Sequence, residues 1–271
     1  MRRIGRSSVL LTLLAFVWLY PVAWTLTNAV RPSADIYRAP WDLAWPPAID
    51  QLGLAWDRAQ LGLALAASAS VTALTVGSVL VLAVGAAYAL TRLRPPLKAV
   101  LFLVVLAPLI IPTEVLIVPV FSLFRDVGLI NSLPGLAVFN VIASISFATV
   151  ILMGFFRTVP TDTVDAARLD GAGRLQVLLR IVVPLARPGI VAVAVLVAVL
   201  TWNDFGGAVV LLQRPDTFTV QLAMSAFATT YATDQGLTFA GMAIAIVPPL
   251  VLVIVAQRDL VRGLAAGASR H

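Results

Sequence analysis

The sequence predicts an all-α integral membrane protein with six transmembrane helices. Of its 271 residues, 60% are hydrophobic and only 12% are charged, whereas a soluble domain usually carries about 25% charged residues. The mean hydropathy is +0.97. A helix needs roughly 20 apolar residues to cross a hydrocarbon core of about 30 Å. Runs of that length lie near residues 9–29, 63–90, 97–121, 134–156, 187–212 and 239–257.

Basic residues predict how these spans are oriented. Fourteen of the 19 Lys and Arg residues fall on one side of a six-span chain, namely Arg2, Arg3, Arg6, Arg92, Arg94, Lys98, Arg157, Arg168, Arg174, Arg180, Arg187, Arg258, Arg262 and Arg270. The remaining basic residues are Arg31, Arg38, Arg58, Arg125 and Arg214. Because basic loops stay in the cytoplasm, we expect both termini and the 157–187 connection there. The net charge of +6 then reflects membrane orientation, and no nucleic-acid partner is expected.

The first span could be mistaken for a secretory signal, because three arginines precede it. Its apolar run is longer than a signal core and lacks a small-residue cleavage site, which favours a retained anchor. The outward loop at 31–60 follows, and there tryptophans stand beside prolines. That mixture indicates a segment lying along the membrane interface.

Small residues and prolines characterise the inner spans. Small residues such as Gly77 and Gly85 in the second span allow close helix packing in lipid. The third span contains Pro108, Pro112 and Pro119, and the sixth contains Pro248-Pro249. Proline removes a backbone donor and bends a helix. Bent helices suit a pathway that opens and closes.

A polar connection at about 157–187 separates the fourth and fifth spans. It reads Asp165-Ala166-Ala167-Arg168-Leu169-Asp170-Gly171, and nine residues after the glycine comes Ile181-Val182-Val183-Pro184. The pattern predicts a polar helix, a turn at the glycine and a second short helix ending near the proline. We expect a rigid segment that projects from the bilayer and can be bound by another protein.

Two acids, Glu114 and Asp204, fall inside expected spans. A carboxylate in hydrocarbon is unfavourable unless it faces water, a partner or the bundle interior. Trp202 and Asn203 precede Asp204, about fifteen residues or roughly 22 Å beyond Arg187. An aromatic ring beside an amide and a carboxylate suits a sugar and its hydroxyls. The four residues are candidate pathway lining. The alternatives are a hydrogen bond to a neighbouring helix and a position near the outer interface.

The composition excludes several kinds of chemistry. Without cysteine there is no disulfide, thiolate metal site or cysteine nucleophile. The single histidine is the last residue, His271. Lys98 is the only lysine and stands outside any G-x-x-x-x-G-K-[ST] pattern, so the chain has no Walker site. We expect no catalytic residue, metal or cofactor in this chain.

The 165–184 segment resembles the EAA loop of importer-type ABC transporter permeases, E-A-A-x3-G-x9-I-x-L-P. Asp165 replaces Glu and Val183 replaces Leu. Over about residues 8–268 the chain is similar to carbohydrate-uptake permeases related to the smaller membrane subunit of the maltose transporter. The similarity rests on 86–93, 112–119, 202–204 and 257–268. Ala67-Ser68 departs from the Asn-Ser of many members.

This resemblance implies one permease domain, 1–271, in the prokaryotic cytoplasmic (inner) membrane, importing a sugar or sugar derivative. Its partners would be a second permease subunit, two ATPase subunits that hold ATP and Mg, and an extracytoplasmic solute-binding protein. The 157–187 loop would be the coupling helix. Its coupling residues would be Asp165, Ala166, Ala167, Asp170, Gly171, Ile181 and Pro184.

Two other classes of function stay open on the residues alone. An ion-coupled secondary transporter could use Glu114 or Asp204, although such proteins often show internal repeats and none is clear here. A structural scaffold would not need bent helices or a buried Trp-Asn-Asp. Which sugar is carried, and which permease subunit holds it, does not follow from the sequence.

Overall fold

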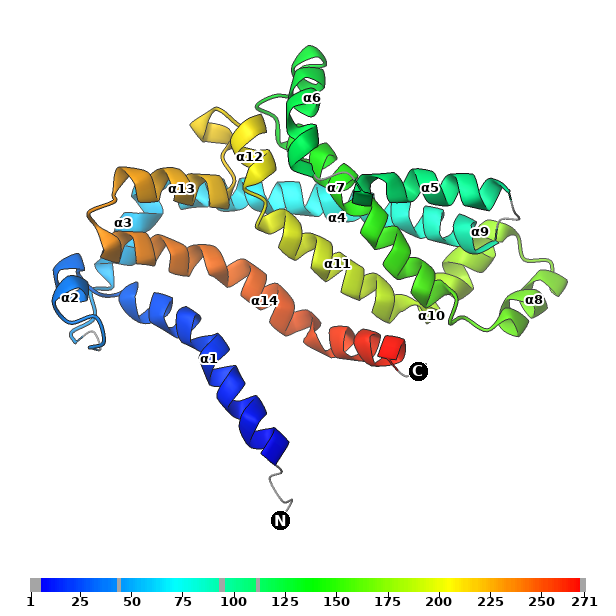
Figure 1. The fold of residues 1–271 in the computed structure, drawn as a ribbon, viewed down its shortest axis with the longest axis horizontal. Helices are drawn as coiled ribbons and strands as arrows, with labels where there is room; N and C mark the ends of the chain where they lie inside the picture. Colours follow the sequence, from blue (N-terminus) through cyan, green and yellow to red (C-terminus); the bar gives the residue numbers. More distant parts are fainter. Residues whose placement is uncertain (1–5, 43–44, 93–95, 111–112, 269–271) are drawn as a thin grey trace. The chain divides into compact units, whose positions relative to one another are not determined.

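The computed structural model describes residues 6–42, 45–92, 96–110 and 113–268, with all their side chains except those of 6–9, 113–114, 116 and 258–268. Every regular element in these ranges is a helix (Figure 1). In chain order they are α1 (Arg6–Asn28), α2 (Ser33–Arg38), α3 (Asp50–Arg58), α4 (Leu61–Arg92), α5 (Leu97–Ile110), α6 (Thr113–Asp126), α7 (Leu133–Phe156), α8 (Thr161–Leu169), α9 (Arg174–Val177), the π-helix η1 (Leu178–Val182), α10 (Val183–Leu185), α11 (Arg187–Trp202), α12 (Gly206–Leu211), the 3₁₀-helix η2 (Pro215–Thr217), α13 (Val220–Thr230) and α14 (Gln235–Ala268).

These helices pack into two compact units. The first unit comprises Met1–Leu65 and Thr219–Val247, and the second comprises Ala66–Phe218 and Pro248–His271. The long helices α4 and α14 each pass from one unit to the other.

Four single helices in the described ranges are long and apolar enough to cross a bilayer. They are Leu10–Asn28, Leu61–Arg92, Leu133–Phe156 and Gln235–Gln257, and they match the first, second, fourth and sixth expected spans. A fifth crossing is possible if Arg174–Leu185 and Arg187–Trp202, which meet at an angle of 79°, are taken as one broken span.

The third and fifth expected spans differ from the sequence prediction. Residues 97–121 do not form one helix but contribute to α5 and α6, of 14 residues each. Pro112, which cannot donate a helical hydrogen bond, stands between them at a position outside the described residues. The expected continuous helix at 187–212 is wrong beyond Trp202, where α11 ends and a turn leads to α12.

Side chains in that turn explain why α11 stops. Asn203 Nδ2 donates to the Val199 carbonyl at 2.8 Å, and Asp204 Oδ1 accepts from the Gly207 amide at 3.0 Å. Side chain to backbone bonds of this kind compete with the helical hydrogen-bond ladder. Apolar residues resume soon after the polar Asn203 and Asp204, so hydropathy averaged over a whole span does not reveal the break.

A buried arginine organises the start of the 31–60 connection in the first unit. Arg31 is 3% exposed, and its guanidinium donates to Asn28 Oδ1 at 3.2 Å, to the Asp35 carbonyl at 3.0 Å and to the Ala39 carbonyl at 2.6 Å. It thereby satisfies the Ala39 carbonyl at the C-terminal end of α2 and is a second donor to the Asp35 carbonyl, which also accepts from the Ala39 amide. These bonds join the end of α1 to α2 and to the segment directly after it.

The second unit is built around α7, which packs against α5, α11 and α12. Its core includes the fully buried Leu90 of α4, Leu152 of α7 and Val193 of α11. At the start of α11, a Cβ on Gly189 would lie 2.2 Å from the ring of Phe155. Only glycine allows α7 and α11 to approach so closely there.

One end of the second unit is held by an asparagine in the left-handed region. Asn131 has a φ of +57°, a conformation that asparagine tolerates better than most residues. Its Oδ1 accepts from the amides of Gln213 at 2.6 Å and Arg214 at 3.1 Å, so the α6–α7 turn is joined to the segment after α12. Hydrogen bonds from Arg214 lower the pKa of Asp216 in the same exposed segment.

Candidate functional site

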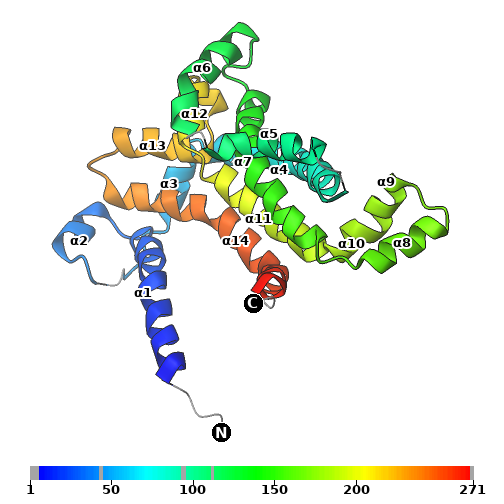
Figure 2. The ribbon, with the colours of Figure 1, turned by 45° about the vertical axis from the view of Figure 1, so that its right-hand side comes forward.

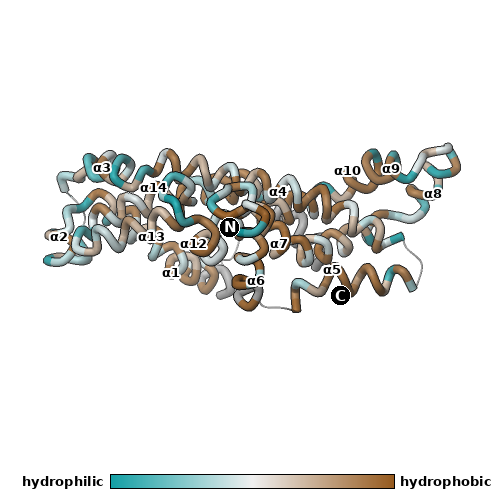
Figure 3. The backbone as a smooth tube through the Cα atoms, turned by 90° about the horizontal axis from the view of Figure 1, so that it is seen from above, coloured by the Kyte–Doolittle hydropathy of each residue, from teal (hydrophilic) through white to brown (hydrophobic). Residues whose placement is uncertain are grey.

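The polar connection at 157–187 forms α8, α9, η1 and α10, which extend beyond the ends of α7 and α11 (Figure 1). Figure 2 shows the same projection after a 45° turn. Hydrophilic residues gather at α8, whereas α5 is mostly hydrophobic (Figure 3). The sequence prediction of a polar helix, a turn and a second short helix is confirmed.

Gly171 makes the turn between α8 and α9. Its φ is +84°, a value that L-residues with side chains rarely adopt. The Gly171 amide donates to the Arg168 carbonyl at 3.0 Å, and the Ala172 amide donates to the Ala167 carbonyl at 2.9 Å. This pair of bonds is the Schellman arrangement that ends a helix at a left-handed glycine.

One face of the loop is fixed to the core of the second unit. Val164 of α8, Val177 of α9 and Val182 of η1 are 0%, 0% and 1% exposed. They belong to the same hydrophobic cluster as Leu90 of α4 and Leu152 of α7. Because these valines are packed into the core, the loop is held as a rigid extension of the helices. Closely packed protein interiors have low compressibility and transmit strain.

The opposite face of the loop is open. Asp165, Ala166, Asp170, Gly171 and Pro184 are exposed, while Ala167 and Ile181 are half-buried. Two leucines on this loop, Leu169 and Leu175, are 89% and 66% exposed. Exposed apolar side chains beside charges are typical of a surface that another protein covers.

Asp165 already has a partner within its own helix. Its Oδ1 lies 3.6 Å from an Arg168 guanidinium nitrogen, and the two side chains are 64% and 42% exposed. An exposed pair of this kind contributes little to stability. Either group is therefore free to exchange its partner for one on another subunit.

The break after α11 is joined to α7 by Asp204. Asn140 Nδ2, on α7, donates to Asp204 Oδ2 at 3.0 Å and also to the Leu136 carbonyl at 3.1 Å. Asp204 Oδ1 accepts from the Gly207 amide at the start of α12. A Cβ on Gly207 would come within 2.6 Å of the Phe139 ring, so α12 sits tightly on α7. Both carboxylate oxygens are occupied by structural hydrogen bonds.

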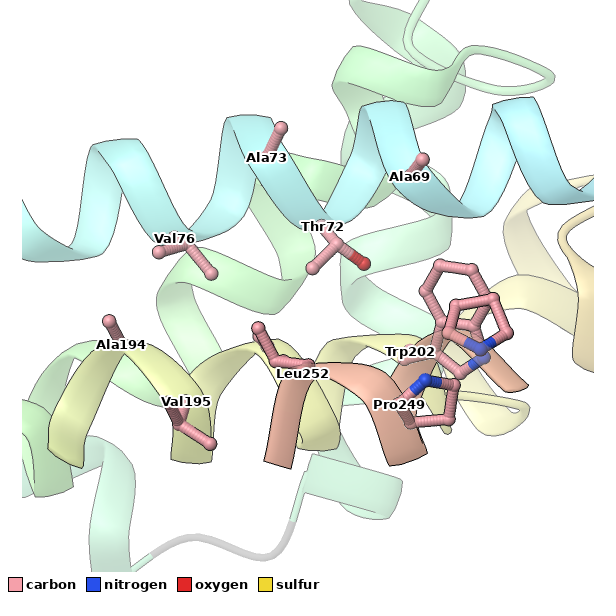
Figure 4. A pocket seen from close by; sticks show the side chains of 11 residues that line it. Ala69, Thr72, Ala73, Val76, Ala194, Val195, Trp202, Pro249 and Leu252 are labelled. Atoms are coloured by element: carbon pink, nitrogen blue, oxygen red, sulfur yellow. The ribbon is translucent and has the colours of Figure 1, made fainter. Parts of the chain in front are cut away.

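A cavity of about 380 Å³ lies within the second unit, between α4, α11 and the second half of α14. Figure 4 shows the side chains around it. Its lining residues are Ala69, Thr72, Ala73, Val76, Ala194, Val195, Ala198, Trp202, Pro248, Pro249 and Leu252. The proline pair of the sixth expected span therefore forms part of its wall.

Of the three candidate pathway residues whose side chains the structure describes, one lines this cavity. Trp202 lines it, whereas Asn203 and Asp204 follow in the turn and do not. Glu114 belongs to the first turn of α6, and its side chain lies outside the described residues. Within the described part of the chain, no group of three or more His, Cys, Asp or Glu residues could hold a metal ion.

Three residues of the turn and the cavity, Asn140, Gly207 and Thr72, are not among those predicted from the sequence. Asn140 could have been found as an amide within an apolar span, since a polar group there needs a partner. Thr72 carries no comparable signal, because a threonine can satisfy its hydroxyl on its own helix. Only the tertiary structure shows that it faces the cavity.

In the described ranges the chain forms an all-helical fold with several apolar helices long enough to cross a membrane and a projecting polar loop, which are features expected of a membrane permease. Residues 79–265 match the family described as binding-protein-dependent transport system inner membrane component, and the chain belongs to this family. It is thus a multi-pass inner-membrane permease subunit of an ABC importer, a kind of subunit that is not itself the ATPase.

Named relatives and a solved structure agree with this family. The diacetylchitobiose uptake system permease protein NgcG of Streptomyces coelicolor is 31% identical over 97% of this chain and 88% of that protein. The trehalose transport system permease protein SugB of Mycobacterium tuberculosis is 30% identical over 98% of each. A crystal structure of a bacterial ABC transporter for the acidic polysaccharide alginate contains a chain that matches with a TM-score of 0.78. That match has 22% identity and covers 94% of this chain and 95% of that one, so it shows the fold alone.

Proposed function

We propose that this chain is one of two permease subunits of an importer that moves a sugar or sugar derivative inward. Two partner ATPase subunits would hold ATP and Mg, and an extracytoplasmic solute-binding protein would deliver the solute. The proposal is supported by the family and by relatives named for diacetylchitobiose and trehalose uptake. The comparisons lend no support to an ion-coupled transporter. Residues 1–271 would act as a single permease domain.

The 157–187 loop carries this proposal. Its buried valines transmit force to the core helices, and its open face presents Asp165, Ala166 and the exposed Leu169 to a partner. A rigid loop with one face packed on the core and the other face exposed can transfer the motion of the ATPase to the membrane helices. We assign Asp165, Ala166, Ala167, Asp170, Gly171, Ile181 and Pro184 to this coupling.

Reversing the charge at Asp165 tests the coupling role. In Asp165→Arg, the anion offered to a basic group of the ATPase becomes a cation, and like charges at a contact are unfavourable. We expect normal insertion, with ATPase co-purification and uptake reduced about tenfold or more. Both are measured in membranes containing equal amounts of permease.

The matched control is Asp126→Arg. Asp126 is 66% exposed and paired with a neighbouring arginine, as Asp165 is, but it ends α6 rather than lying on the loop. This variant should retain the ATPase. Equal ATPase recovery and uptake for both variants would remove the coupling assignment.

For the pathway, we propose that Trp202 lines the solute route together with the proline pair of α14. Asn203 and Asp204 would stand at the end of α11 beside that route, with Asp204 also fixing the turn. Glu114 stays a further candidate.

The proposed topology places both termini and the loop near Arg174 in the cytoplasm and the segment near Asp50 outside. It is supported by the bias of basic residues. Single cysteines at Arg174 and Asp50 can be introduced into a chain that has none. An impermeant thiol reagent added to whole spheroplasts should label position 50 and spare position 174. Labelling of position 174 from outside would overturn the orientation.

A further inference from the structure

The cavity in the second unit contains two polar groups without a hydrogen-bond partner. Trp202 is 8% exposed, and its indole Nε1 has no acceptor. Thr72 Oγ1, on α4, is also buried and unpartnered. Figure 4 shows the Thr72 hydroxyl on the side of the cavity where Trp202 and Pro249 lie. Eight buried side-chain polar atoms of the described residues lack a partner, and these two are the ones on residues that line the cavity. Buried polar groups usually have a hydrogen-bond partner, so the pair is consistent with a ligand that supplies one.

The remaining wall of the cavity is apolar and partly flat. The indole of Trp202 lies beside the ring of Pro249 (Figure 4). Pro248 also lines the cavity, and aliphatic side chains close the other sides. A pyranose ring has a matching surface, because its axial C–H groups form an apolar face and its hydroxyls lie around the edge. Apolar walls with a few placed polar groups are usual in sites for such ligands.

The polar groups also match hydroxyls in their hydrogen-bonding capacity. The indole N–H can only donate, whereas the threonine hydroxyl can donate and accept. Two neighbouring hydroxyls of one ring can satisfy both groups at once. At about 380 Å³, the cavity lies near the lower end of the range of about 300–1,000 Å³ for ligand sites. One sugar ring fits that volume better than a whole oligosaccharide does.

The charge of the cavity restricts the ligand further. None of its eleven lining residues is charged. A uronic acid placed there would bury a carboxylate without a cation, which is strongly unfavourable. The cavity therefore selects an uncharged ring.

We propose that this cavity is a subsite for one uncharged pyranose ring of the transported solute, with Trp202 as the stacking surface and Thr72 and the indole N–H as hydrogen-bonding groups. The inference rests on the proposed import of a sugar. With only two polar contacts, the subsite holds the ring weakly, as a pathway requires if the solute is to leave again.

The test uses the complete transporter, with its partner permease, ATPases and solute-binding protein, in proteoliposomes. Labelled trehalose and diacetylchitobiose serve as neutral probes, and an alginate trisaccharide serves as the charged one. Thr72→Val removes the hydroxyl at nearly constant shape, and Trp202→Phe removes the N–H while keeping a ring. Each should lower sugar taken up per ATP hydrolysed about three- to tenfold, as expected for one neutral hydrogen bond.

Two controls separate a sugar contact from helix packing. Thr72→Ser keeps the hydroxyl and should restore most of the uptake. Thr75→Val removes a hydroxyl from the same helix, at a fully buried position that faces the Ala137 carbonyl of α7 and not the cavity. It should leave uptake per ATP within about twofold of the wild type, since it removes no contact with the solute.

The outcomes distinguish this inference from the proposed function. Neutral sugar uptake that is unaltered in Thr72→Val and Trp202→Phe would overturn the subsite and leave sugar import standing. Better uptake of the alginate trisaccharide than of either neutral sugar by the wild type would overturn the uncharged assignment. Loss of assembled complex in Thr72→Val would mean that the partner permease fills the cavity. No uptake of any sugar in a wider panel of neutral and acidic sugars by an ATPase-active wild type would overturn both proposals.

Discussion

Replacing Gly171 by proline is expected to abolish coupled transport while the permease still inserts into the membrane. The glycine has a φ of +84°, and proline is restricted to about −65°. The substitution also removes the amide that donates to the Arg168 carbonyl. The α8–α9 turn must then open, which displaces the exposed face of α8. We expect uptake and ATPase co-purification to fall at least about twentyfold at equal permease levels.

Two milder substitutions control for this result. Gly171→Asn introduces the side chain that best tolerates the left-handed region and should retain a large part of the uptake. Gly173 has a φ of −69°, and a Cβ there would lie 3.9 Å from its nearest neighbour, so Gly173→Ala should be nearly silent. Unaltered uptake in Gly171→Pro would show that the turn does not transmit ATPase motion.

The loop could be predicted because the residues that determine its structure are close together in the sequence. The glycine, the polar helix before it and the valines of the loop are all within about 20 residues of each other in the sequence. The structure shows which face of the loop is buried: Val164 and Val177 lie in the core, whereas Asp165 and Leu169 are exposed. That direction depends on α4 and α7, which are distant in the sequence, so periodicity alone could not assign it.

The broken spans show that hydropathy does not predict where a helix ends within an apolar segment. An apolar run predicts that a segment avoids water, but it does not register a helix end inside the run. α11 ends where Asp204 accepts hydrogen bonds from the Gly207 amide and from the Asn140 side chain. Asn140 is 64 residues away in the sequence. The cavity also depends on residues that are distant in the sequence, since Thr72, Trp202 and the proline pair come from three helices. Trp202 was predicted from its residue type, but its neighbours across the cavity were not.

The hydrogen bond between Asn140 and Asp204 should be required for a correctly assembled transporter. In Asn140→Ala, Asp204 Oδ2 loses its donor in a half-buried site, which costs about 1–3 kcal/mol, and the α11–α12 turn loses its link to α7. We expect a lower thermal unfolding temperature of the purified complex and about fivefold less uptake. Asp204→Ala should be at least as severe, because it also removes the acceptor for the Gly207 amide.

The double variant decides whether the two residues act as one link. If they do, Asn140→Ala combined with Asp204→Ala should be little worse than Asp204→Ala alone, because the second change removes a donor whose acceptor is already gone. Thr149→Val is the control, since it removes a hydroxyl that bonds within α7, to the Ile145 carbonyl, and it should have a small effect. Additive losses, or reduced uptake at an unchanged unfolding temperature, would instead assign Asp204 to direct solute contact. The turn after α11 would then be held to α7 by the packing of α11 and α12 on α7, which includes the close approach of Gly207 to Phe139.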